Sequence, residues 1–301
     1  MLPELTLEAG SRYEKSQLKQ QGDTVRTRKL SYLKPSALVT WEFAPSDEVR
    51  LGYERQAGQL DFNNFVSSVN LSQGQVSSGN PNLRPYTLWQ TELAWEHRFS
   101  PGSLTLTARD QRISDTYDRI MLASAAGLLD ALGNVGSGKR REFQANFNMP
   151  MDWANPALAG VTIQGSWLRR FSSVMDPLTG EERRISGDNG TEGKVTITKD
   201  VPAARMRYGV TYTHSVDKPN WRFNEFMRNL NPEFIDAFVE YKPAPDWQIR
   251  LIGENLTDRP ISRIRDVYAG PRNSAAKNYI EFNPEDTGMR VGLNIQHTLG
   301  Q

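Results

Sequence analysis

The chain of 301 residues contains no cysteine and only three histidines, His97, His214 and His297. Without cysteine it has no disulfide, no thiolate nucleophile and no zinc–thiolate centre, and the absence is compatible with an oxidising compartment. The histidines lie far apart and lack the spacing of metal ligands. The sequence therefore predicts no metal site and no cofactor.

Long apolar runs are missing as well, and no stretch of about 18 apolar residues could form a transmembrane helix. The 36 Lys+Arg residues balance 35 Asp+Glu, so the formal charge of +1 gives no indication of a nucleic-acid partner. Residues Met1 to Leu5 show neither the basic nor the apolar region of a secretory signal. If the protein is exported, we expect the chain to be a fragment or its start to be misplaced.

What the sequence does contain is alternation. Between Trp89 and Phe99 the apolar residues fall on odd positions and the polar residues on even ones, a period of two that predicts a β-strand. Two prolines, Pro81 and Pro85, exclude a helix immediately before it. About twelve such strands of about ten residues can be traced along the chain.

The connections between these strands alternate between short turns and long polar segments. Short turns are expected near residues 44–47, 100–102, 151–159, 200–203 and 243–246. Long loops are expected at residues 15–34, 58–83, 172–191, 213–234 and 255–286. The stretch from Ile120 to Leu132 could form a short helix or a packed loop, and we favour the loop.

A β-sandwich has no reason to place all short turns at one end, whereas a transmembrane barrel does. The predicted fold is an all-β, antiparallel up-and-down transmembrane β-barrel spanning residues 1–301, with both termini at the short-turn end. Residues predicted to point outward are Trp89, Leu93, Trp95, Val161, Ile163, Trp167, Val291 and Leu293. Residues predicted to point inward are Glu92, Glu96, Gln164, Arg250 and Arg290.

No catalytic constellation stands out. His97 shares the apolar face, as the histidine of a barrel hydrolase would, but no serine and carboxamide accompany it, and an interfacial histidine is favoured. Arginines and aromatic residues crowd the last two long loops and could capture an anionic ligand through bidentate bonds. The candidate ligand-facing residues are Trp221, Arg222, Arg263, Arg265, Tyr268 and Arg272. A solvated loop that touches lipopolysaccharide phosphates is the alternative.

Three motifs carry a family resemblance. Asn80-Pro81-Asn82-Leu83-Arg84-Pro85 precedes the alternating strand, Gly133-Asn134-Val135-Gly136 leads into Arg141-Glu142-Phe143, and Glu254-Asn255-Leu256-Thr257-Asp258 lies near the end of the chain. Together they resemble motifs of TonB-dependent outer-membrane receptors. The motif residues singled out are Asn80, Pro81, Asn82, Leu83, Pro85, Asn255, Leu256 and Asp258.

The resemblance implies the C-terminal portion of a 22-stranded barrel in the outer membrane of a Gram-negative bacterium. Its implied function is uptake of a siderophore, an oligosaccharide or a cobalamin. The implied partners are outer-membrane lipid, lipopolysaccharide and TonB, which would act through an N-terminal plug and TonB box that this sequence lacks. A passive outer-membrane pore is the alternative, and a barrel hydrolase lies behind it.

Overall fold

The computed structural model describes residues 4–20, 26–61, 68–70, 75–99, 101–124 and 127–298. Met1 to Pro3, at the start of the chain, and Ser100, in one expected turn, lie outside the described residues. The chain divides into two compact units. The first unit holds residues 1–95, 108–141 and 172–185, and the second holds 96–107, 142–171 and 186–301.

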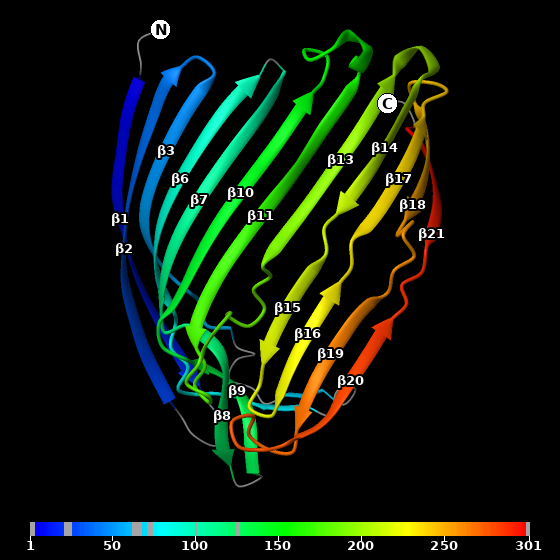
Figure 1. Cartoon of the computed structure of the whole chain (residues 1–301). Coiled ribbons are helices and arrows are strands. Elements are labelled where there is room, and N and C mark those ends of the chain that lie inside the picture. Colours follow the sequence, from blue (N-terminus) through cyan, green and yellow to red (C-terminus); the bar gives the residue numbers. More distant parts are fainter. Residues whose placement is uncertain are drawn as a thin grey trace. The chain divides into compact units, whose positions relative to one another are not determined.

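Twelve strands follow one another in a single up-and-down order, and a short thirteenth, β12 (Glu182–Arg183), pairs with β11. Among the described residues, no strand pairing closes this order into a ring, and its strands are drawn in Figure 1. Its members are β1 (Glu4–Gln20), β2 (Arg26–Ala44), β3 (Asp47–Ala57), β6 (Thr87–Phe99), β7 (Gly102–Ser114), β10 (Gly138–Pro150), β11 (Val161–Met175), β13 (Thr191–Val201), β14 (Met206–Thr213), β17 (Phe234–Tyr241), β18 (Trp247–Glu254) and β21 (Arg290–His297). The expected number of strands and their nearest-neighbour antiparallel pairing are confirmed.

Two smaller four-stranded sheets use chain segments that the sequence assigned to loops. One has the order β15 (Val216–Trp221), β16 (Glu225–Asn231), β19 (Ile261–Tyr268) and β20 (Lys277–Glu285), and is called the β15–β20 sheet from here on. The other has the order β4 (Ser68–Asn70), β5 (Gln75–Ser78), β9 (Gly127–Asn134) and β8 (Tyr117–Ser124). Both are visible in Figure 1.

Several loop predictions are therefore wrong. The polar segment 15–34 is mostly strand, because β1 and β2 pair continuously from Glu4↔Glu42 to Gln20↔Arg26. The stretch from Ile120 to Leu132 is neither helix nor irregular loop but part of the β8–β9 hairpin. Backbone hydrogen bonds make a hairpin whether or not its side chains alternate in polarity, so polar composition alone could not exclude strands here.

The strand registers show how the apolar face is built. Directly opposite residues on neighbouring strands share a face, and Ile163 lies opposite Ile197, which lies opposite Val210. One position along, Gln164 lies opposite Thr196, which lies opposite Thr211. Pairing thus extends each strand's alternation into one apolar face and one polar face, with the predicted members Ile163 and Gln164 on opposite faces.

Among the described residues, the buried apolar side chains lie in the first unit, and four of them form a small cluster. Leu88, Ile113, Val174 and Ile185 are buried together, with Tyr86 and Val135 against them. Most large apolar side chains are exposed instead, among them Leu93 and Leu251, each 49% exposed. In the described part of the chain, no helix has the length and apolar character needed to cross a membrane.

Candidate functional site

The Asn80–Pro85 motif forms a tight, buried turn in the first unit. The Asn80 side chain accepts a hydrogen bond from the Asn82 backbone at 2.9 Å and donates one to the Leu132 carbonyl at 2.9 Å. Leu83 is fully buried, and the Arg28 guanidinium donates to its carbonyl at 2.6 Å. An Asx turn of this kind fixes the chain direction before a strand, so the motif sets where β6 begins.

The second motif is docked on the first. The Asn134 side-chain oxygen accepts from the Arg84 backbone at 2.9 Å, and its amide nitrogen donates to the carbonyls of Arg84 and Asp115, both at 2.8 Å. Arg84 also pairs with the Asp115 carboxylate at 2.7 Å. The side chain of Asn134 therefore replaces the backbone partners that the chain lacks at this junction, which explains why an amide is needed.

The third motif is centred on Asn255, which is buried and has a left-handed φ of 50°. Its side-chain oxygen accepts from Thr257 Oγ1 at 3.0 Å, and its amide donates to the Arg259 carbonyl at 3.2 Å and the Gly288 carbonyl at 3.3 Å. Asp258 accepts from the Met289 backbone at 3.1 Å. These bonds join the end of β18 to the start of β21, whereas Leu256 is exposed.

An ion-pair triad of Arg265, Glu225 and Glu281, with the first two side chains buried, lies in the β15–β20 sheet. Arg265, only 7% exposed at its side chain, donates to Glu225 at 2.6 Å and to Glu281 at 2.8 Å. The hydrogen bond to Glu225 raises the pKa of Arg265 above its ordinary value. Arg263 shares the Glu281 carboxylate at 3.4 Å. Two cations thus face two carboxylates, and Arg265 connects the three strands β16, β19 and β20.

The remaining candidate residues meet at the two turns that connect β15 to β16 and β19 to β20, called the outer turns from here on. Arg272 Nε donates to the Arg222 carbonyl at 2.6 Å, and the Tyr268 backbone donates to the Asn224 carbonyl at 2.9 Å. The Trp221 ring packs 5.1 Å from the Phe226 ring. The structure therefore brings Trp221, Arg222, Tyr268 and Arg272 together, although Arg222 and Arg272 lie 50 residues apart in sequence.

Sequence reasoning missed a second buried ion-pair group, in the first unit. Arg183 donates to Asp118 at 2.7 Å and to Asp176 at 2.6 Å, and all three side chains are at most 8% exposed. This group joins the β8–β9 hairpin to the connection after β11. Nothing in the sequence pointed to it, because Arg183 and Asp118 are 65 residues apart.

The polar face of the second unit is hollowed. A cavity of about 730 Å³ is lined by side chains that include Gln164, Thr196, Thr211 and Arg250. Most of the polar lining side chains are uncharged hydrogen-bond donors and acceptors, and the charged ones include both cations and a carboxylate, Glu240. Such a wall suits passage of a hydrated or polar solute rather than tight capture at one point.

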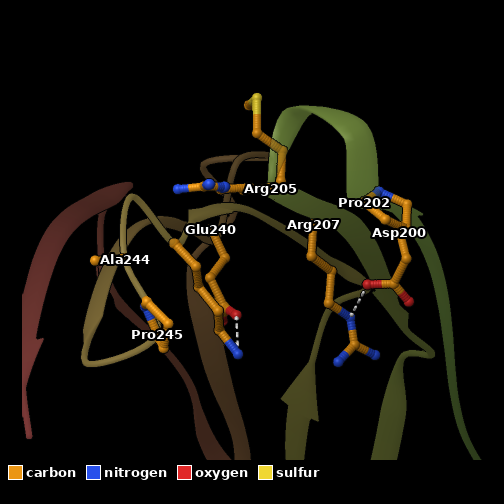
Figure 2. Close-up of a pocket in the computed structure, with 9 residues that line it drawn as sticks. Asp200, Pro202, Arg205, Arg207, Glu240, Ala244 and Pro245 are labelled. Atoms are coloured by element: carbon orange, nitrogen blue, oxygen red, sulfur yellow. Dashed lines mark ion pairs between the residues drawn. The ribbon is translucent and has the colours of Figure 1, made fainter.

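A smaller pocket of about 460 Å³ opens at the short-turn end (Figure 2). Arg207 pairs with Asp200 at 3.6 Å, and Lys242 pairs with Glu240 at 3.6 Å. Arg205, at a left-handed φ of 52°, donates to the Pro243 carbonyl across the pocket. Arg207, Asp200 and Lys242 are each about half exposed, so these long pairs are weak. Glu240, by contrast, is buried and also accepts a hydrogen bond from Gln248 Nε2 at 2.9 Å.

Comparison with known families decides the class of protein. Residues 2–256 match the family described as TonB dependent receptor-like, beta-barrel. The chain belongs to this family. The predicted family resemblance is confirmed, and membership implies a place in the outer membrane of Gram-negative bacteria. The family consists of receptors and transporters, not enzymes, so the barrel-hydrolase alternative is set aside.

Solved structures of the family share the fold at low sequence identity. The siderophore receptor PiuA from Acinetobacter baumannii is 14% identical with a TM-score of 0.64, over 97% of this chain and 40% of that one. The FrpB iron transporter from Neisseria meningitidis (F3-3 variant) is 13% identical with a TM-score of 0.63, over 97% and 42%. The ferric citrate transporter FecA is 12% identical with a TM-score of 0.68, over 97% and 42%.

These relationships have a clear limit. The chain spans about two fifths of the length of these receptors. No curated protein matches the chain by sequence. The comparisons therefore give the fold and the family.

Proposed function

We propose that these residues are the C-terminal barrel portion of a TonB-dependent outer-membrane receptor that imports a scarce ligand. The observation that carries the proposal is the family match over residues 2–256. The open order of twelve strands fits a piece of a larger barrel, and residues 1–301 would form one part of that single domain. TonB would act on the receptor through a segment outside these residues.

Among the ligand classes, a ferric siderophore is the first to test, because the similar structures include a siderophore receptor, an iron transporter and a ferric citrate transporter. An oligosaccharide or a cobalamin would be carried by the same architecture. The low sequence identity means that ligand choice rests on this chain's own side chains.

We assign ligand contact to the outer turns of the β15–β20 sheet. Trp221, Arg222, Tyr268 and Arg272 would present guanidinium groups beside aromatic rings, a combination suited to an anionic chelate. Arg265, and to a lesser extent Arg263, would act indirectly, since their charges are already matched by Glu225 and Glu281. Around the barrel, outer-membrane lipid and lipopolysaccharide would be the surrounding partners.

Uptake measurements test the proposal. The full-length gene is expressed in a deletion strain with and without TonB, and entry of radiolabelled ferric siderophore, oligosaccharide and cobalamin is measured under iron limitation. We expect saturable entry of one ligand only when TonB is present. Arg222→Gln should raise the half-saturation concentration about tenfold, the effect of losing one charge-assisted hydrogen bond.

The matched control is Arg228→Gln, which removes an arginine of the same sheet that lies outside the candidate set and pairs with Asp217 at 2.8 Å. It should leave the half-saturation concentration unchanged. Entry that rises linearly with concentration and does not depend on TonB would instead establish the passive pore. A half-saturation concentration unaltered in Arg222→Gln would remove the loop assignment and leave the transport function standing.

A further inference from the structure

Two consecutive arginines on β11 have opposite surroundings. Arg170 is half-buried on the polar face and donates to Glu142 at 2.6 Å and to Glu192 at 3.0 Å. Arg169 is exposed and, by alternation, points to the other face. Across the part of the chain that the structure describes, no carboxylate pairs with Arg169. One arginine is neutralised twice, and its neighbour has no counter-ion.

The Arg169 guanidinium is nevertheless held in place. Nη1 donates to Thr191 Oγ1 at 2.6 Å, and the guanidinium carbon lies 4.9 Å from the centre of the Phe171 ring. A guanidinium has five N–H donors in a planar fork, and the bond to Thr191 uses one of them. A ring on one side and a hydroxyl at one corner orient the fork without compensating its charge.

This arginine lies where the apolar face ends. Ile163, Trp167 and Phe171 share its face on β11, and Phe171 is 51% exposed. The Trp167 ring lies 4.8 Å from His214, whose Nδ1 is 3.2 Å from the Tyr212 hydroxyl. Aromatic rings with polar edges are typical of a membrane–water interface. The β11 end that follows leads into a long connection, and long connections of outer-membrane barrels are external.

We propose that Arg169, Phe171 and Thr191 form a site on the lipid-facing surface that binds a phosphate of lipopolysaccharide in the outer leaflet. The proposal rests on the proposed placement of the chain in the outer membrane. An uncompensated cation beside lipid is costly, and a phosphate of the neighbouring lipid is the group that supplies the missing charge. Arginine's fork binds phosphate through two parallel hydrogen bonds.

The first unit, taken by itself, repeats the pattern. Arg112 and Arg141 share one carboxylate, Asp110, at 3.7 Å and 2.9 Å. Their side chains are 81% and 68% exposed. By alternation they lie on the faces of exposed Leu106 and Phe143. An excess of positive charge beyond the apolar band therefore occurs twice, and it fits an anionic leaflet.

Native mass spectrometry of the full chain, purified in detergent, measures the affinity for bis-phosphorylated lipid A and for lipid A lacking phosphates. Arg169→Gln should weaken binding of the phosphorylated lipid about fivefold, as expected for one basic residue at a lipid surface. It should leave the dephosphorylated lipid unaffected, and Arg169→Lys should keep part of the affinity. Arg290→Gln is the control for a basic residue on the polar face, because Arg290 is 69% exposed, pairs with Glu254 and is predicted to point inward.

Equal losses in Arg169→Gln and Arg290→Gln would overturn the site, and so would an unchanged affinity in Arg169→Gln. Phosphatidylglycerol that binds as tightly as lipid A, with the same dependence on Arg169, would overturn the choice of lipopolysaccharide. Heat-dependent migration on gels confirms that each variant is folded. If the unaltered chain binds none of the lipids, the membrane placement fails as well; if it binds lipid A regardless of Arg169, only the site fails.

Discussion

Replacing Arg265 by methionine tests whether the ion-pair triad of Arg265, Glu225 and Glu281 stabilises the β15–β20 sheet. The change leaves Glu225, whose side chain is 3% exposed, without its 2.6 Å partner. Stranding a buried charge costs about 3–5 kcal/mol. Because Glu281 is 32% exposed and can be hydrated, we expect the lower end, about 3 kcal/mol.

Hydrogen exchange measured by mass spectrometry reports this loss directly. Amides of β16, β19 and β20 should exchange about a hundredfold faster in Arg265→Met, since each power of ten corresponds to about 1.4 kcal/mol of opening free energy. Strands β11, β13 and β14 should be unaffected. Lys277→Met is the control, because its 2.8 Å pair with Asp266 lies at the surface and should contribute little to stability.

The double variant Arg265→Met with Glu225→Leu separates charge from packing. It removes both buried charges and should recover most of the lost protection, since an apolar pair of similar volume often replaces a buried ion pair at little cost. If Arg265→Met exchanged no faster than Lys277→Met, the triad would not stabilise the sheet, and the buried geometry would have been misjudged.

Three further predictions concern the faces, a buried phenol and a motif residue. Leu93→Arg should cost about 2–4 kcal/mol in lipid refolding while Gln164→Arg costs little, and equal costs would contradict the face assignment. Burial raises the pKa of Tyr117 to about 12, so the free energy of unfolding should fall between pH 10 and about 12, where the phenol of Tyr117 ionises only in the unfolded chain; Tyr117→Phe should make that fall smaller in pH-dependent denaturation. Asn255→Ala should lower thermal stability more than Asn255→Gly, because only alanine is strained at a φ of 50°.

The strands that cross the apolar band were predictable because alternation is a local property. Each residue's face follows from its position within the strand, so Leu93 and Gln164 could be assigned without knowing their neighbours. The short turns were equally predictable from local sequence. In Pro243 to Asp246, for example, the two prolines lack the backbone N–H that a strand needs for hydrogen bonding. Strand registers such as Ile163 opposite Ile197 then place the apolar residues of neighbouring strands on the same face of the sheet.

The outer hairpins were not predictable in the same way. Their strands are short and do not keep a clean alternation of apolar and polar residues, and they form because a partner strand supplies backbone hydrogen bonds. The stretch from Ile120 to Leu132 carries leucines at helix-like and strand-like spacings together, so local propensity could not choose between them. The antiparallel pairing of β8 with β9, together with the hydrogen bond from the Asn80 side chain to the Leu132 carbonyl, decides that this stretch forms a hairpin.

The sequence by itself thus determined the approximate number of strands in the main sheet, their alternation between an apolar and a polar face, and the family, because alternation and short motifs are encoded in neighbouring residues. Only the tertiary structure separated Arg265, buried between two carboxylates, from Arg222 at the outer turns, although both belonged to one candidate set. It also separated Arg169 from Arg170, adjacent arginines with opposite electrostatic surroundings. An arginine's role depends on which charges reach it, and those come from strands tens of residues away in the chain.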